Sequence, residues 1–160
     1  MITQSRLKEL LHYDPKTGVF TYRVKTSYRV EIGNVAGCDN GKGYLQIRLD
    51  AVLYKAHRLA WLYMTGAFPA LGVDHENGIH GDNKWDNIRE ATKKRNGENQ
   101  RKAHKNSTTG LLGVTNRGNK FRATLHTEGV RHYLGDFNTP EEAHAAYVLS
   151  KRKLHEGCTI

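Results

Sequence analysis

Three side chains between residues 74 and 96 have the types that metal-assisted phosphodiester chemistry needs. Asp74 and His75 are neighbours, and Asn96 follows about twenty residues later. Carboxylate and amide oxygens together are ligands for a hard divalent cation such as Mg²⁺, which usually keeps several waters and adds phosphate oxygens of its substrate. An imidazole with an ordinary pKa of about 6.5 accepts a proton from water at neutral pH. The pattern predicts a metal site at Asp74 and Asn96, with His75 beside it as general base.

The flanking sequence predicts elements that would position these side chains. Two short strands, at 73–75 and 87–91, would enclose a polar loop. A helix would begin at Lys93 and run to about residues 100–102. This hairpin would bring Asp74 close to the first turn of the helix, whose positive end favours phosphate. By spacing alone, a capped turn with a structural histidine is the more common explanation of this pattern.

The longer string resembles the HNH (His-Me finger) endonucleases of phages and of intron-encoded homing elements. The similarity covers about residues 55–102, through the strings HRLAW, VDHENG and DNKWDNIREAT and the later Asn96. The resemblance implies that Asp74 and Asn96 ligate the metal and that His75 activates the attacking water. It also implies that Asn87 orients His75 by tying the loop to itself. Since Asn stands at the last position, where many members have His, the implied metal is Mg²⁺ or Mn²⁺.

The C-terminal third has an alternating basic pattern. Strands are predicted at 120–127 and 130–137, followed by a helix that begins at Thr139-Pro140. One face of these strands would be exposed to solvent and would carry almost no acidic residues. An ordinary solvated sheet gives the same alternation, but a basic three-stranded sheet backed by one helix can also enter a major groove of DNA.

This region, about residues 107–157, also resembles the AP2/ERF DNA-binding domain in the string YLGDFNTPEEA and the following Ala146-Tyr147. In that family the outward residues of the sheet read DNA. The matching positions here are Arg117, Arg122, Thr124, His126, Arg131 and Tyr133. Thr115, Thr124 and His126 differ from the residues common in plant members, so no target sequence is transferred.

The positive charge of the chain is concentrated near the predicted helix. The chain has 25 Lys and Arg against 16 Asp and Glu, a formal net charge of +9. Residues 93–105 contain six basic residues and one acid, so more than half of the excess lies there. Such a run is either a solvated face or a contact with nucleic-acid phosphates. Both interpretations apply to Arg95, our candidate DNA contact on this helix.

Together these patterns predict an α+β protein of two modules. An HNH nuclease domain of the ββα-metal type at 1–102 would be joined by a linker at 103–108 to an AP2-like domain at 109–160. We expect a metal-dependent endonuclease that acts on double-stranded DNA, with site preference from the AP2-like domain. A non-catalytic DNA-binding regulator that retains an HNH fold is the alternative.

Other features narrow the setting. No apolar run approaches the roughly 20 residues of a membrane span, and no secretory signal is evident at the N-terminus. We therefore expect a cytoplasmic protein, encoded by a phage or a bacterium, without a membrane partner. Cys38 and Cys158 do not provide the ligand set of a zinc-organised module, a third possibility. One nuclease site per chain predicts a monomer or a transient dimer.

Overall fold

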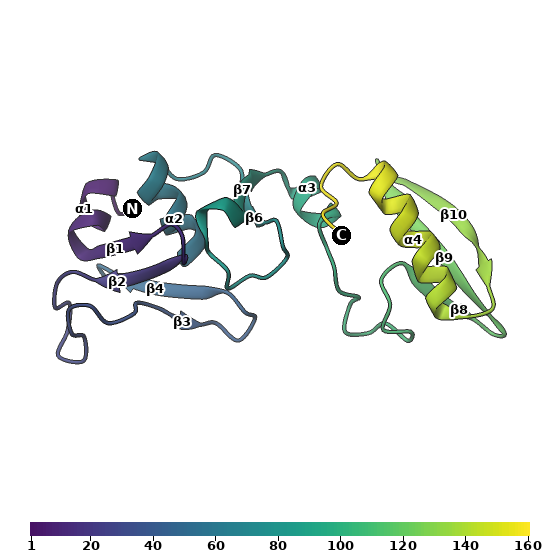
Figure 1. The fold of residues 1–160 in the computed structure, drawn as a ribbon, viewed down its shortest axis with the longest axis horizontal. Coiled ribbons are helices and arrows are strands. Elements are labelled where there is room, and N and C mark those ends of the chain that lie inside the picture. The colour runs from purple at the N-terminus through teal and green to yellow at the C-terminus, as the bar shows by residue number, and fades with distance from the viewer. The chain divides into compact units, whose positions relative to one another are not determined.

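The computed structural model describes residues 1–160 and is of the α+β class. The chain packs as two units, Met1–Lys93 and Lys94–Ile160 (Figure 1). This division lies at the start of the short helix α3, Lys93–Glu98. The boundaries expected at 102 and 109 describe modules that function independently. A division by packing does not test independent function, so these boundaries stay a prediction.

The first unit contains two α-helices and three small antiparallel sheets. The sheets pair β1 with β2, β3 and β5 with β4, and β6 with β7. Thr3 caps the first helix, since its Oγ1 accepts a hydrogen bond from the Arg6 N–H at 3.2 Å. The elements are α1 Gln4–Leu10, β1 Leu11–Asp14, β2 Val19–Tyr22, β3 Cys38–Asp39, β4 Leu45–Leu49, β5 Val52–Lys55, α2 Ala56–Thr65, β6 Gly72–His75, the 3₁₀ turn η1 Trp85–Asn87 and β7 Ile88–Ala91.

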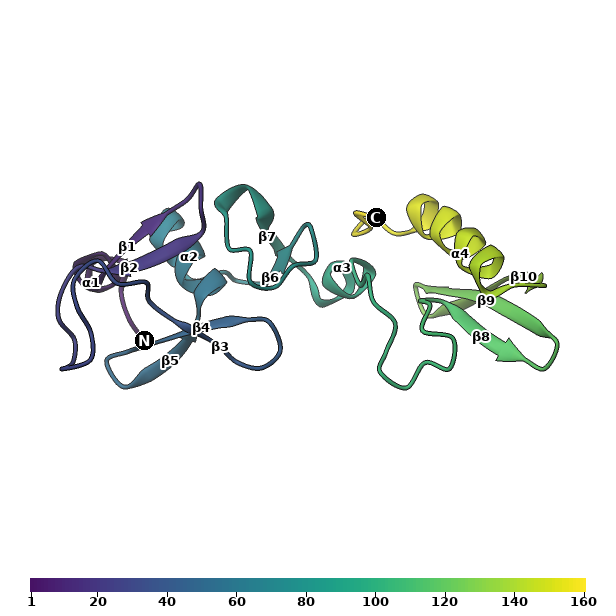
Figure 2. The ribbon, with the colours of Figure 1, turned by 60° about the horizontal axis from the view of Figure 1, so that its bottom comes forward.

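The core of the first unit joins the helices to the strands. Leu7 of α1, Phe20 of β2, Ile47 of β4 and Leu59 of α2 are all buried in one apolar cluster. Helix α2 packs against α1 and the β4–β5 hairpin (Figure 2). Trp85 packs on this cluster, with its ring centroid 5.3 Å from that of Trp61. The core therefore reaches the loop between β6 and β7.

The second unit has a three-stranded antiparallel sheet with a helix across one face (Figures 1 and 2). The strand order is β10-β9-β8. The helix begins at Thr139-Pro140, as the sequence predicted, and Thr139 and Glu142 form a capping box there. The elements after α3 are β8 Val114–Arg117, β9 Lys120–Thr127, β10 Val130–Phe137 and α4 Pro140–Leu154.

Small residues allow α4 to lie close to the sheet. Ala123 of β9 and Ala143 of α4 are completely buried in the core of this unit. Gly113 has a φ of 77°, and a Cβ there would lie 2.0 Å from the ring of Tyr147. Only glycine can therefore occupy position 113 without moving α4.

Two helices end earlier than the local sequence pattern suggests. Leu11 falls at helical spacing with Leu7, but it begins β1 and pairs with Tyr22, so its backbone joins the strand ladder and not the helix. The helix expected to reach residues 100–102 ends at Glu98. There the carboxylate Oε2 accepts a hydrogen bond from the Gly157 N–H at 3.0 Å, so the C-terminal tail takes the place of another helical turn.

Candidate active site

Asp74 and His75 lie at the end of β6, which pairs antiparallel with β7. The register places Asp74 opposite Arg89 and His75 opposite Ile88. Both predicted site residues are buried, with 5% and 2% of their surface exposed. A buried carboxylate and a buried imidazole need polar partners, and the adjacent strand and loop supply them.

Asn83 determines which nitrogen of the His75 ring carries the proton. His75 Nε2 lies 3.1 Å from Asn83 Oδ1. Because an amide oxygen can only accept, Nε2 donates, and in the neutral ring the lone pair is on Nδ1. Burial lowers the pKa of His75 below its ordinary value, and the bond to Asn83 offsets part of that shift. The ring is therefore neutral at pH 7 and can accept a proton.

Other aromatic rings lie next to His75. The His57 ring of α2 meets it edge-to-face with centroids 5.1 Å apart, and the centroid of Tyr44 is 6.1 Å away. Tyr44 in turn stacks on His80, with centroids 4.0 Å apart and planes within 8°. Burial lowers the pKa of His57 to about 3, and its Nδ1 has no hydrogen-bond partner. These contacts restrict the orientation of the His75 ring.

The side chain of Asn87 ties the loop after His75 to itself. Its Oδ1 accepts a hydrogen bond from the Asn77 N–H at 2.9 Å, and its Nδ2 donates to the Asp82 carbonyl at 2.7 Å. The Glu76 N–H donates to the Asn87 carbonyl at 2.8 Å. An amide can both donate and accept, so one side chain closes both ends of the loop. The orienting role that the resemblance implies for Asn87 requires such contacts.

The turn between β1 and β2 supports the same loop from outside. Tyr13 is buried, and its hydroxyl donates to the Asn83 carbonyl at 2.7 Å. The Trp85 N–H donates to the Pro15 carbonyl at 2.9 Å. A Cβ at Gly18 would lie 2.4 Å from the Asn83 carbonyl carbon, so this turn lies directly against the backbone of the residue that holds His75.

Asp74 is a suitable oxygen ligand, although it already has a cationic partner. Its Oδ2 accepts hydrogen bonds from Arg89 Nε at 3.3 Å and Nη2 at 3.1 Å. A carboxylate and an amide fit Mg²⁺, which often takes only one or two carboxylates and fills its shell with water and phosphate oxygens. No cluster of three or more His, Cys, Asp or Glu side chains suits a metal anywhere in the chain. A cation at Asp74 and Asn96 would therefore have few protein ligands.

Asn96 and Arg95 lie on α3 and are exposed. Asn96 belongs to the second unit and Asp74 to the first, so their pairing at one metal stays a proposal. Helix α3 has six residues. So short a helix aligns few peptide dipoles, and the attraction for phosphate expected at its N-terminus is correspondingly weak.

The six DNA-contact candidates of the second unit share the sheet face opposite α4. The register pairs Arg131 with His126 and Tyr133 with Thr124, and side chains two residues apart along a strand share a face. The face contains Arg117, Arg122, Thr124, His126, Arg131 and Tyr133.

The sequence predicted almost no acidic residues on this face, and the structure corrects that prediction at one position. Asp136 lies opposite Arg122 in the register. Its two carboxylate oxygens accept hydrogen bonds from Arg122 Nε at 2.8 Å and Nη2 at 2.9 Å. The Arg122 guanidinium also lies 5.1 Å from the centre of the Tyr133 ring. Arg122 is thus held in one orientation.

Sequence reasoning missed Asn83, Tyr44 and Tyr13. Asn83 lies in a polar loop with no periodicity, where nothing distinguishes it from its neighbours. Tyr44 precedes a strand, and Tyr13 lies about sixty residues before His75. Their contacts with the site depend on the packing of distant segments and have no local signal.

Comparison with known proteins gave a match, and it covers the segment that contains Asp74 and His75. Residues 54–98, from the end of β5 to the end of α3, match a family model described as HNH endonuclease. No curated protein and no solved structure gave a significant match. No helix has the length and apolar character needed to cross a membrane. The matched segment covers a little over a quarter of the 160 residues and indicates a nuclease or DNA-binding function.

Proposed function

We propose that this protein is a metal-dependent endonuclease that hydrolyses phosphodiester bonds of double-stranded DNA. The observation that carries the proposal is the state of His75: a buried, neutral imidazole whose Nε2 proton is held by Asn83. The loop that contains Asn83 is closed by Asn87. This arrangement falls within the segment that matches the HNH endonuclease model.

His75 would act as the general base. Its Nδ1 accepts a proton from a water molecule while the oxygen of that water attacks the scissile phosphorus. The bond to the departing 3′ oxygen breaks and leaves a 5′-phosphate. Asn83 and Asn87 keep the ring oriented through this step, so they are positioning residues. A bound Mg²⁺ or Mn²⁺, held by Asp74 and Asn96, would stabilise negative charge on the phosphate and the departing oxygen.

The AP2-like sheet is proposed to supply site preference. Asp136 occupies the Nε–Nη2 edge of Arg122, so the Nη1–Nη2 edge would be the one that contacts DNA. That edge can donate two hydrogen bonds to O6 and N7 of a guanine in the major groove. The other residues of the face and Arg95 would contact further bases or phosphates.

The setting of the activity is also a proposal. We infer an enzyme of the phage or homing type that acts in a bacterial cytoplasm. One candidate His75 site per chain favours nicking by a monomer or cleavage by a transient dimer. The basic segment 93–105 would add salt-sensitive affinity for the phosphate backbone.

One observation favours the alternative, a DNA-binding regulator that retains an HNH fold. Arg89 already neutralises Asp74, with Nη2 at 3.1 Å from Oδ2. A metal would have to bind beside this guanidinium. If the ion pair excludes the metal, the chain binds DNA without cleaving it.

A cleavage assay with matched variants separates the two functions. The unmutated protein should nick or cut supercoiled plasmid in Mg²⁺ or Mn²⁺ but not in EDTA. His75→Ala should abolish cleavage and leave duplex binding nearly unchanged. His12→Ala, at an exposed histidine of β1 in the same unit, is the control and should cleave normally.

A loss of folding must be distinguished from a loss of chemistry. Trp61 and Trp85 are the two tryptophans of the chain, so their fluorescence reports on the first unit alone. His75→Gln, which keeps a polar group at this position, should also be inactive with an unchanged fluorescence spectrum. If the unmutated protein binds duplex DNA but cleaves nothing with any divalent cation, the alternative function, a DNA-binding regulator, is correct.

A further inference from the structure

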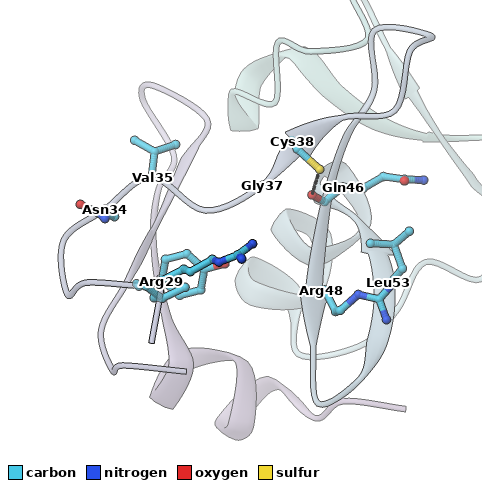
Figure 3. Close-up of a pocket in the computed structure, with 10 residues that line it drawn as sticks. Arg29, Asn34, Val35, Gly37, Cys38, Gln46, Arg48 and Leu53 are labelled. Carbon is cyan, nitrogen blue, oxygen red and sulfur yellow. Dashed lines mark hydrogen bonds between the residues drawn. The ribbon is translucent and has the colours of Figure 1, made fainter. Parts of the chain in front are cut away.

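A basic groove lies in the first unit, on the outer side of the β3–β4–β5 sheet. Its volume is about 530 Å³. Figure 3 shows Arg29, Asn34 and Val35 from the 23–35 segment on one side, and Arg48 and Leu53 from β4 and β5 on the other. None of the residues assigned to His75 chemistry lines it.

The groove carries two arginines without a carboxylate partner. Arg29 lies over the Tyr28 ring at 5.0 Å, and Arg48 Nη1 donates to the Ala51 carbonyl at 3.3 Å. No Asp or Glu lines the groove. In the same segment Glu31 is paired with Lys25 at 2.7 Å. The two guanidiniums therefore present positive charge that the protein does not neutralise.

One strand connects this groove to the candidate active site. The outer face of β4 carries Gln46 and Arg48, because alternate residues of a strand share a face. Tyr44, which directly precedes β4, continues the same row. Tyr44 lies next to His75, with ring centroids 6.1 Å apart. Lys55 pairs with Gln46 in the register, and its Nζ lies 4.8 Å above the Tyr44 ring. Polar and cationic groups thus extend over about 13 Å from Tyr44 to Arg48, at about 3.3 Å per residue.

Apolar side chains lie between the charges. Val35 is 67% exposed and Leu53 is 47% exposed, and both border the groove. A free phosphate ion would contact the guanidiniums and leave these side chains in water. A DNA strand alternates anionic phosphates with apolar deoxyribose faces, so it would contact both kinds of group. Along the axis of a duplex, where each base pair takes 3.4 Å, a length of about 13 Å corresponds to about four base pairs.

We propose that the Arg29–Arg48 groove binds the sugar-phosphate backbone of duplex DNA about four base pairs from the phosphate that faces His75. The proposal rests on the proposed nuclease function for its position relative to the cut. The two arginines contact phosphates, while Val35 and Leu53 pack against deoxyribose. These contacts hold the duplex in register over the active site and do not read bases.

The salt dependence of DNA binding tests the groove in the full chain. The affinity for a 30-base-pair duplex is measured by fluorescence anisotropy in EDTA at several KCl concentrations. For R29A/R48A the slope of log K against log[KCl] should decrease in magnitude by about 1.8, because each phosphate contact contributes about 0.9. Relative to the unmutated chain, the loss of affinity should be roughly tenfold larger at 50 mM than at 200 mM KCl.

The control removes the same charge elsewhere in the first unit. Arg6 is paired with Asp50 and Glu9, and Lys25 with Glu31. R6A/K25A should therefore leave the slope unchanged. Tryptophan fluorescence checks that both double variants remain folded, and R29K/R48K should retain most of the slope.

The outcomes are distinct from those of the cleavage assay. A normal slope for R29A/R48A overturns the groove proposal, whether or not the protein cuts DNA. A reduced slope in a protein that never cuts supports DNA binding by the groove and refutes the nuclease. If the protein cuts, R29A/R48A should lose hydroxyl-radical protection about four base pairs from the cut. Inorganic phosphate could instead stabilise the unmutated protein against heat but not R29A/R48A. If R29A/R48A then also has a normal DNA slope, the groove binds a small anion and the proposal is overturned.

Discussion

The two units present their candidate functional residues in opposite ways. In the first unit His75 and Asp74 are buried, and hydrogen bonds hold both side chains: His75 donates to Asn83, and Asp74 accepts from Arg89. In the second unit the β8–β10 face contains residues such as Arg131 and Tyr133 that are largely exposed. The first arrangement suits proton transfer, which needs one defined geometry, and the second suits contact with a large ligand surface.

This difference indicates which contacts the proposed function of each unit depends on. The orientation of His75 depends on a chain of contacts through Asn83 to Tyr13 and the turn at Gly18. The sheet face depends on the close packing of α4 behind it. A single substitution should therefore damage chemistry in the first unit or DNA reading in the second, without affecting the other.

The largest expected effect separates the units by stability. Gly113→Ala should destabilise the second unit by about 3–5 kcal/mol, because the Cβ overlaps the Tyr147 ring and the φ of 77° is strained for alanine. Gly118→Ala is the control. Its φ is 68° but nothing lies within 4 Å of the added Cβ, so it should lose only about 1 kcal/mol. Urea unfolding followed by far-UV circular dichroism measures both.

Tryptophan fluorescence in the same experiment tests the independence of the units. For Gly113→Ala the unfolding midpoint of the Trp61 and Trp85 signal should stay where it is in the unmutated protein. A parallel shift of the fluorescence midpoint would show that the units fold together and would remove the basis of the comparison.

The next effect concerns the loop around His75. Asn87→Ala removes the hydrogen bonds to the Asn77 N–H and the Asp82 carbonyl, so His75 loses its defined orientation. Cleavage should fall about a hundredfold or more, while duplex affinity changes less than twofold. Asn119→Ala, in the exposed β8–β9 turn, should cleave normally. Normal cleavage by Asn87→Ala would mean that the loop does not position the base.

Acid should destabilise the first unit through His57. Burial lowers the pKa of His57 to about 3, whereas an unfolded histidine has a pKa of about 6.5. Unfolding therefore takes up a proton below pH 6.5, and stability is lost as the pH falls from there toward 3. At pH 5 the loss due to His57 is about 2 kcal/mol relative to neutral pH.

The fluorescence of Trp61 and Trp85 during urea unfolding at pH 7 and pH 5 measures this loss. In His57→Gln the difference between the two pH values should shrink by about 2 kcal/mol. An undiminished difference in that variant would place the acid sensitivity elsewhere.

The smallest effect concerns DNA reading. Asp136→Ala releases the Nε–Nη2 edge of Arg122, so the guanidinium can adopt several orientations. Discrimination among duplex targets should fall about tenfold, within the 1–3 kcal/mol that one bidentate base contact contributes, without loss of total affinity. Glu141→Ala, at an exposed acid of α4, removes the same charge and should keep the preference. Binding to a panel of duplexes measures both.

Much of the fold followed from local patterns. The strands at 120–127 and 130–137 and the helix start at Thr139-Pro140 were predicted, because alternation and capping chemistry act between close neighbours. The end of the first helix was not predicted. Leu11 fits the helical spacing, and pairing with Tyr22 decided otherwise. Likewise α3 ends at Glu98, where a contact with Gly157 replaces further turns.

The candidate site divides in the same way. The adjacent pair Asp74 and His75, and Asn87 after the polar loop, stand out from their residue types and spacing. The sequence by itself therefore determined which residues are chemically able to act. Only the tertiary structure decided their state, because Asn83 selects the protonated nitrogen of His75, Arg89 neutralises Asp74, and Asp136 orients Arg122. These partners come from other loops and strands, and burial and hydrogen bonding across such distances leave no periodic trace in the chain.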